Sequence, residues 1–356
     1  MNARVLDIRR IQDSMAKGES TVGESEEIMD SLLEGTSRSF YLTLKVLPKK
    51  IRKQISLGYL LPRLSDTIAD SKVGENKILL KLLEEYNQRI QDEKNPMPDF
   101  SELAEIQEDF AEARLLKEAI VPISYLEKSE KLNDSDRKEI RKLLQIIISG
   151  QILDLERFTN ASEGKIISLV NENELDDYTY RVAGSVGEFW THMSLNHLFT
   201  MRDHKKEILF KKAVKFGKSL QLINILRDIP EDLKMGRCYI PSRTLNGIDM
   251  TTQDLLEMKN IEKFRPLYNS YIDRAEKYLD EAVDYIKMLP RNQFRLRLSC
   301  LIPVLIGQRT LQLLREGNIL DYGNRIKVSR SEIKKIMRKS IWLSITGISP
   351  KKMNLS

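Results

Sequence analysis

Apolar residues recur at intervals of three and four along nearly the whole chain. Two stretches show the pattern clearly: Ile140, Leu143, Leu144, Ile147, Ile148 and Ile152 in the first, and Phe216, Leu220, Ile223 and Leu226 in the second. This period places the apolar side chains on one face of an α-helix. No series of segments alternates apolar and polar residues, as half-buried strands would. The pattern therefore predicts an all-α protein.

Turn-forming residues interrupt the helical pattern at four places: 94–98, 131–134, 235–237 and 321–324. None of these breaks resembles a long flexible linker. The segment Ser329-Arg330-Ser331-Glu332 has the spacing of a capping box, so we expect the last helix to begin there. The whole chain, 1–356, is expected to form one helical domain with short connections and a basic tail over 325–356.

The charge balance and the cysteine count narrow the class of protein. The chain has 58 basic and 52 acidic residues, a formal charge of +6. That charge suits an anionic substrate, but the basic residues are interspersed with acids, which argues against a nucleic-acid-binding face. Cys238 and Cys300 are the only cysteines, too few for a disulfide framework or a zinc site. With no signal peptide and no run of roughly 20 apolar residues, we expect a cytoplasmic protein.

A first pair of carboxylates stands in the segment from Arg63 to Asp70. Asp66 and Asp70 are four residues apart, so on a helix they share one face. Two carboxylates on one face can share a divalent cation. Two aspartates at this spacing are, however, more often solvated surface residues, and the pair alone does not separate the two interpretations.

A second constellation is more specific. Asn224, Asp228 and Asp232 step by four along one helical face, beside a strongly apolar face. All three offer oxygen atoms, the ligands that magnesium prefers. Asn and Asp are poor interior helix formers, which favours a metal site over an ordinary acidic helix end. Pro230 disfavours helix at Ile229, so a kink would either turn Asp232 off the face or aim it at the metal.

Four sequence blocks follow one another in order: Ser37-Arg38-Ser39-Phe40; Tyr59 and Arg63 with Asp66 and Asp70; Tyr178 to Gly187; and Gln221 to Asp232, continuing through Gly236-Arg237-Cys238-Tyr239-Ile240-Pro241. In these blocks the chain resembles squalene and phytoene synthases, over about residues 37–330. The resemblance implies a helical isoprenoid-synthase fold around a central apolar cavity. It also implies two aspartate motifs facing each other, and the joining of two allylic diphosphates through a cyclopropyl intermediate.

The resemblance also implies roles for individual residues. Both carboxylate groups would hold magnesium, one at each substrate, to stabilise charge on the leaving diphosphate. Arg63 and Arg227 receive catalytic roles, because guanidinium binds phosphate in bidentate fashion; a salt bridge to a neighbouring aspartate is the alternative. The implied substrate-binding residues are Ser37, Arg38, Ser39, Phe40, Tyr59, Val182, Ala183, Val186, Gly187, Gln221, Arg237 and Tyr239.

The third block carries a catalytic tyrosine and two glycines. Tyr178 matches a family tyrosine at the catalytic centre, where it would relay a proton or stabilise positive charge; anchoring a helix end is the alternative. Glycine inside a helix costs up to about 1 kcal/mol relative to alanine. Gly184 and Gly187 would permit close approach of a prenyl chain, or tight packing of two helices.

The leading hypothesis for the product is squalene, made from two molecules of farnesyl diphosphate through presqualene diphosphate. Thr67, directly after Asp66, favours the squalene-forming relatives over the polyene-forming ones. Squalene formation needs a hydride, usually from NADPH. The segment Lys327-Val328-Ser329-Arg330 resembles one used near that cofactor's phosphate, so Lys327 and Arg330 are candidate cofactor-binding residues; a solvated helix start is the alternative.

Two other functions stay open from the sequence. The same condensation without reduction would give dehydrosqualene or phytoene, and an inactive helical partner of such a synthase would keep the fold without the chemistry. The basic stretch from Arg325 to Lys339 suits a peripheral contact with the anionic inner face of a membrane. Ordinary solvation of surface lysines explains the same charges.

Overall fold

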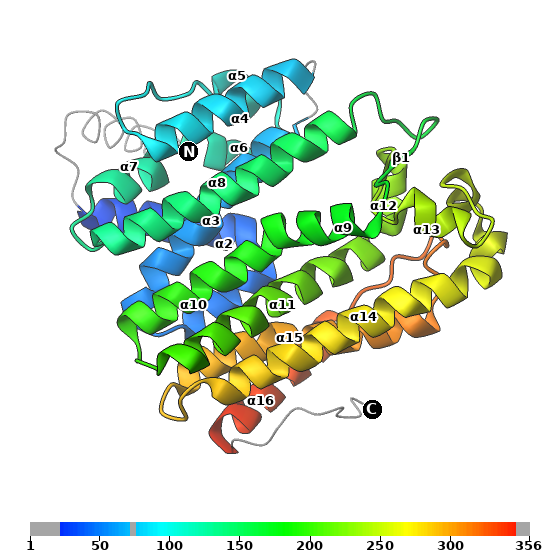
Figure 1. Ribbon diagram of the computed structural model, residues 1–356. Helices are drawn as coiled ribbons and strands as arrows, with labels where there is room; N and C mark the ends of the chain where they lie inside the picture. The colour runs from blue at the N-terminus through cyan, green and yellow to red at the C-terminus, as the bar shows by residue number, and fades with distance from the viewer. Residues whose placement is uncertain (1–21, 72–75, 347–356) are drawn as a thin grey trace. The chain divides into compact units, whose positions relative to one another are not determined.

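The computed structural model describes residues 22–71 and 76–346, except for some side chains inside helices. Within these ranges the chain is helical almost throughout, with one pair of two-residue strands, which confirms the all-α prediction (Figure 1). The chain divides into two compact units, Met1–Lys45 with Lys49–Leu155, and Val46–Pro48 with Glu156–Ser356. A single domain over the whole chain stays a prediction, and the end of the expected tail, 347–356, lies outside the described residues.

The first unit contains the helices drawn from blue to blue-green in Figure 1: α2 (Val22–Val46), α3 (Lys49–Ala69), α4 (Asn76–Gln91), α5 (Ser101–Ile106), α6 (Phe110–Lys117), α7 (Ile120–Lys128) and α8 (Asp134–Arg157). Helix α3 contacts α4, α6 and α7. Tyr86 of α4 is fully buried and donates its hydroxyl proton to the carbonyl of Leu61 at 3.0 Å. Near the other end of α3, Gln54 donates to Asp136 of α8 at 3.0 Å. Apolar packing and these buried polar bonds hold α3 in place.

The second unit contains the remaining elements: β1 (Ile167–Ser168), α9 (Glu172–Thr179), η1 (Tyr180–Gly184), α10 (Ser185–His197), α11 (Asp203–Arg227), α12 (Ile229–Lys234), β2 (Arg237–Cys238), α13 (Ser242–Asn246), η2 (Gln253–Leu256), η3 (Met258–Asn260), α14 (Ile261–Met288), α15 (Phe294–Glu316) and α16 (Arg330–Thr346). Helix α11 packs most extensively against α14 and also contacts α10 and α15, as Figure 1 shows. Tyr268 of α14 is fully buried and donates to the carbonyl of Leu226 at 3.0 Å. None of the described helices is long and apolar enough to cross a bilayer.

The third sequence block folds into a helical run with a π turn in it. Helix α9 passes directly into the π-helical segment η1, which passes into α10. A Cβ atom on Gly187 would lie only 2.1 Å from the carbonyl oxygen of Ala213, and one on Gly217 only 2.0 Å from that of Ala183. The glycines are therefore needed for the backbone of this run to approach the backbone of α11. Helix packing, one of the two alternatives, accounts for Gly187 without a substrate.

One expected chain break and the expected capping box lie in the second unit. Gly236 adopts φ +76°, a conformation that side chains rarely allow, and it leads from α12 into β2. Strand β2 pairs in parallel with β1. The expected capping box is confirmed: the N–H of Glu332 donates to the Ser329 hydroxyl at 3.2 Å, and the Ser329 N–H donates to the Glu332 carboxylate at 2.9 Å. Helix α16 begins at the next residue, Arg330.

Candidate functional site

The first carboxylate region consists of Asp66 and Asp70, at the end of α3. The N–H of Asp70 donates to the carbonyl of Asp66 at 2.8 Å, so the two residues lie one helical turn apart, as their spacing predicts. Asp66 is half-buried and Asp70 is exposed. The Asp66 carboxylate accepts a hydrogen bond from Gln151 Nε2 of α8 at 2.5 Å. Asp66 is thus partly enclosed by a second helix, whereas Asp70 lies at the surface.

The proton affinity of Asp66 is unusual. Burial and the nearby charge of Asp70 raise the pKa of Asp66 to about 7, against the opposing effects of Arg63 and the Gln151 hydrogen bond. An ionised carboxylate is disfavoured where water is excluded and another negative charge is close. Asp66 therefore retains a proton up to about pH 7, and a bound divalent cation would compete with that proton.

Arg63 forms an ion pair with a residue of helix α6. Its guanidinium forms an ion pair with Glu112 of α6, and Gln107 Nε2 donates to the same carboxylate at 3.1 Å. Burial acts to lower the pKa of Arg63, but the charges of Glu112 and Asp66 outweigh it and raise that pKa. Arg63 therefore forms a salt bridge, but with a residue of another helix and not with the neighbouring aspartate of the alternative. Its partner is a glutamate that sequence reasoning missed.

Two hydroxyl groups, that of Ser37 in the first block and that of Tyr59 in the second, are already bonded within the unit. Ser37 Oγ donates to the carbonyl of Leu33 at 2.5 Å, and Tyr59 donates to the carbonyl of Thr36 at 3.1 Å. The Tyr59 ring stacks on Phe40 with centroids 5.0 Å apart. Donation to a substrate would require both hydroxyls to exchange these partners. Two predicted side chains of the first block, those of Arg38 and Ser39, lie outside the described part of the chain.

The second carboxylate region consists of Asn224, Asp228 and Asp232. Helix α11 ends one residue before Asp228, and α12 begins one residue after it. The N–H of Asp228 donates to Asn224 at 2.8 Å, and the N–H of Asp232 donates to Asp228 at 2.9 Å. The four-residue spacing therefore continues across the helix break. Pro230 lies in the first turn of α12, where its missing N–H costs nothing.

Two arginines neutralise this second region. Arg227 donates to both oxygens of the Asp228 carboxylate, from Nε at 2.8 Å and from Nη2 at 2.5 Å. Arg325, from the segment before α16, reaches the same carboxylate at 3.2 Å and Glu231 at 3.1 Å. Hydrogen bonding to Asp228 raises the pKa of Arg227. For Arg227 the salt-bridge alternative describes the ligand-free chain, and Arg325 is a contact that sequence reasoning missed.

The predicted catalytic tyrosine belongs to an aromatic group. Tyr178 of α9 stacks on Tyr239, with centroids 4.6 Å apart and an interplanar angle of 20°. Tyr239 meets Phe158 edge to face at 5.4 Å, and the Arg237 guanidinium lies 5.9 Å from the centre of the Phe158 ring. The electron-rich ring faces of such a group attract positive charge. The structure thus brings Tyr178, Tyr239 and Arg237 together around Phe158, which sequence reasoning did not select.

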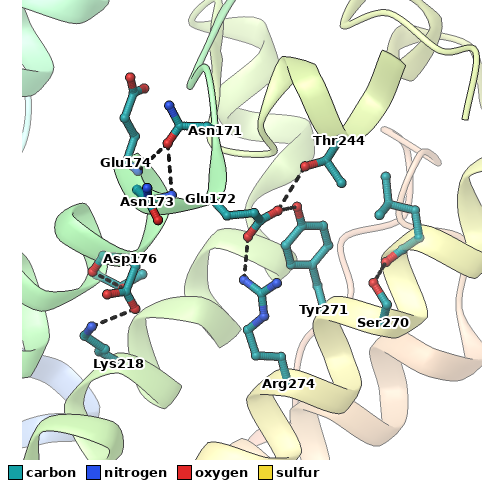
Figure 2. A network of polar contacts seen from close by, with 12 residues as sticks. Asn171, Glu172, Asn173, Glu174, Asp176, Lys218, Thr244, Ser270, Tyr271 and Arg274 are labelled. Atoms are coloured by element: carbon teal, nitrogen blue, oxygen red, sulfur yellow. Dashed lines mark hydrogen bonds and ion pairs between the residues drawn. The ribbon is translucent and has the colours of Figure 1, made fainter. Parts of the chain in front are cut away.

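A partly exposed ionic network anchors the helix that carries Tyr178 (Figure 2). The Glu172 carboxylate at the start of α9 accepts hydrogen bonds from Thr244 at 3.0 Å, Tyr271 at 2.5 Å and Arg274 at 2.6 Å. Burial acts to raise the pKa of Glu172, but the bonds from Tyr271 and Arg274 outweigh it and lower that pKa. Helix α9 is therefore tied to α13 and α14 by an ionised carboxylate.

Both carboxylate regions have atoms that suit magnesium. The described residues contain no group of three or more His, Cys, Asp or Glu side chains placed to hold an ion. Magnesium, however, usually takes one or two carboxylates and completes its shell with water and substrate phosphate. The first region also has a buried amide oxygen, Gln151 Oε1, that no described group contacts by a hydrogen bond. The donor chemistry therefore fits the ion that the motifs imply.

Comparison with known proteins decides the family. The family model described as squalene/phytoene synthase matches residues 33–332, which include both carboxylate regions. The chain belongs to the squalene/phytoene synthase family. This agrees with the resemblance in the four blocks, which covered about residues 37–330.

Family relatives and solved structures extend this result. The chain is 25% identical over 314 residues to a bifunctional lycopene cyclase/phytoene synthase of Podospora anserina, covering 86% of this chain and 50% of that protein. It thus spans half the length of that relative. Its fold matches TcSQS in complex with the ligand E5700, with a TM-score of 0.74, 18% identity, and coverage of 91% and 90%. It also matches a dehydrosqualene synthase with a TM-score of 0.63, 22% identity, and coverage of 92% and 99%. These likenesses confirm the isoprenoid-synthase helical fold.

The other residues that the squalene/phytoene synthase resemblance selects occupy three places. Val182, Ala183 and Val186 are half-exposed on the η1–α10 run. Gln221 lies one turn before Asn224 on α11, and the two amides are 3.5 Å apart. Lys327 and Arg330 are exposed, just before α16 and at its first residue.

Proposed function

We propose that this chain joins two molecules of farnesyl diphosphate head to head through presqualene diphosphate and, with NADPH, yields squalene. The observation that carries the proposal is the family match over residues 33–332 together with the intact spacing of both carboxylate regions. A chain that had lost the chemistry would have no reason to keep two such sets of oxygen ligands. The alternative of an inactive helical partner is therefore the weaker one.

Each carboxylate region would serve one diphosphate. Magnesium supplies positive charge that stabilises the departing diphosphate. Asp66 and Asp70 would hold it in the first region, and Asn224, Asp228 and Asp232 in the second. Once a cation neutralises Asp228, its partner Arg227 would become available to bind phosphate oxygens in bidentate fashion.

The allylic cation left after diphosphate departure needs stabilisation without a nucleophile. The stacked rings of Tyr178 and Tyr239, with Phe158 beside them, present electron-rich faces and few reactive groups. Water near such a cation would quench it to an alcohol, so an apolar surrounding protects the coupling. We assign this group to cation stabilisation.

The reductive step separates two candidate products. Lys327 and Arg330 are exposed cations that suit the phosphate groups of NADPH, and this supports squalene. The phytoene synthase part of the Podospora anserina relative's name supports the same condensation without reduction, giving dehydrosqualene or phytoene. NADPH dependence of the product therefore discriminates between them.

The test is a product analysis by mass spectrometry. Purified protein would be incubated with magnesium and farnesyl diphosphate, with and without NADPH, and in parallel with geranylgeranyl diphosphate. Squalene that appears only with NADPH supports the proposal. A more unsaturated thirty-carbon product in both incubations, or phytoene from the longer substrate, supports the second candidate. No coupled product from either substrate supports the inactive partner.

We also propose that the basic stretch from Arg325 to Lys339 rests on the anionic inner face of a membrane. Lys334, Arg338 and Ile341 follow at intervals of four and three along α16, and all are exposed. Basic side chains beside an apolar one suit the headgroup region. Cosedimentation with vesicles of phosphatidylglycerol, but not of phosphatidylcholine, would support this contact. Equal recovery with both would contradict it.

A further inference from the structure

Gln151 of α8 reaches the first carboxylate region through a hydrogen bond. It is 8% exposed, and its Nε2 atom lies 2.5 Å from Asp66 Oδ1. Its other polar atom, Oε1, is buried and has no hydrogen-bond partner among the described residues. A buried amide oxygen without a hydrogen-bond partner lowers the stability of the fold. A partner that arrives with a bound ion or substrate explains why the oxygen is kept there.

The position of this oxygen relates it to the cation. Oε1 and Nε2 are bonded to the same carbon, so the free oxygen lies beside the atom that touches Asp66. The region offers only two carboxylates on its own helix, Asp66 and Asp70. Magnesium seeks six oxygen ligands and keeps water or substrate oxygens where the protein supplies too few. An amide oxygen at this place would coordinate the ion or accept a hydrogen bond from one of its waters.

An amide suits this position better than a third carboxylate. In the cation-free chain it donates a hydrogen bond to Asp66 and adds no negative charge to a region that already holds two carboxyl groups. With a cation bound, the same side chain offers a neutral oxygen ligand. We propose that Gln151 is part of the first cation site, where it orients Asp66 and supplies an additional oxygen to the ion or its water shell. This inference rests on the proposed function of the first carboxylate region.

The chain contains a matched control for the alternative that Gln151 only joins two helices. Gln54 is 4% exposed and donates from α3 to Asp136 of α8 at 3.0 Å. It therefore makes the same kind of buried amide–carboxylate bond between the same two helices, away from the first carboxylate region. If helix joining were the whole role, Gln54→Met and Gln151→Met would behave alike.

The experiment measures Mn²⁺ binding by electron paramagnetic resonance, with inorganic diphosphate present, on the full chain. We expect Gln151→Met to weaken the tightest Mn²⁺ site by about tenfold, as removal of supporting groups around metal ligands commonly does. Gln54→Met is expected to lower the melting temperature but to leave Mn²⁺ affinity unchanged. Gln151→Glu is expected to bind Mn²⁺ more tightly than the wild type at pH 8, because it adds a charged oxygen ligand.

Three outcomes decide the matter. Wild-type Mn²⁺ affinity in a folded Gln151→Met protein overturns the inference. If that variant does not fold, a Gln151→Glu protein with no gain in affinity overturns it instead. Asp66→Asn tests the underlying site: unchanged Mn²⁺ binding in that variant removes the first region as a cation site altogether. Loss of binding there, with no effect at Gln151, overturns only the role of Gln151.

Discussion

The two carboxylate regions look alike in sequence but are held differently in the folded chain. In the first, Asp66 has a neutral amide partner and a like-charged neighbour, while the nearest arginine, Arg63, is paired with Glu112. In the second, Asp228 is bound by Arg227 and Arg325. Among the described salt bridges, Asp228 pairs with arginines and Asp66 pairs with none. A cation would relieve repulsion in the first region and compete with arginines in the second.

The prediction with the largest expected effect tests whether both carboxylate regions are needed for the same reaction. Asp66→Ala and Asp228→Ala are each expected to lower turnover by at least about 100-fold, since loss of charge stabilisation at a leaving group has effects of that size. The measurement is release of diphosphate from farnesyl diphosphate under saturating magnesium. Asp203→Ala is the control, because that side chain is 97% exposed at the start of α11. Near wild-type turnover in either variant would show that its carboxylate is not a metal ligand.

The second prediction concerns stability: substitutions in the two regions should change the free energy of unfolding in opposite directions. Without magnesium at pH 8, Asp66→Asn is expected to raise the free energy of unfolding by about 2 kcal/mol, because it removes a disfavoured charge. Asp228→Asn is expected to lower it by about 1 kcal/mol, because Arg227 and Arg325 lose their shared counter-ion. Urea unfolding measures both values. If both substitutions changed the free energy of unfolding in the same direction, the proposed difference between the two carboxylate regions would be wrong.

The sequence predicted the features that depend on neighbours along the chain. The spacing of Asp66 and Asp70 gave their common helical turn, and the Ser329–Glu332 capping box gave the start of α16. Each of these rests on backbone geometry within one or two helical turns. For the same reason, the helical period alone was enough for the all-α fold.

The partners that set the charge of each region could not be predicted in this way. Glu112 lies 49 residues from Arg63, Gln151 lies 85 from Asp66, and Arg325 lies 97 from Asp228. Such contacts depend on how helices pack, which a single sequence does not state. The π turn over Tyr180–Gly184 was missed for another reason, since a single π turn within a longer helical run has no apolar spacing of its own.

The third prediction uses pH to isolate the first region. Because the pKa of Asp66 is raised to about 7, the folded state holds a proton there that the unfolded state has already lost. Stability from this proton is complete below about pH 4 and is lost, by up to about 1.4 kcal/mol per pH unit, as pH rises to about 7. The melting temperature of Asp66→Asn should therefore rise relative to that of the wild type between pH 5 and 7, and the difference should stay constant above pH 7.

The smallest expected effect tests whether arginine competes with the cation in the second region. Arg325 is 54% exposed at its side chain, so its ion pairs with Asp228 and Glu231 contribute less than about 1 kcal/mol to stability. Arg325→Gln should cost little stability and should bind Mn²⁺ at the second region about two- to threefold more tightly, because an ion no longer displaces a guanidinium. The control is Arg338→Gln, which removes an exposed arginine from α16. Unchanged Mn²⁺ affinity in Arg325→Gln would mean that Arg227 alone neutralises Asp228, and the contrast between the regions would then depend on one arginine.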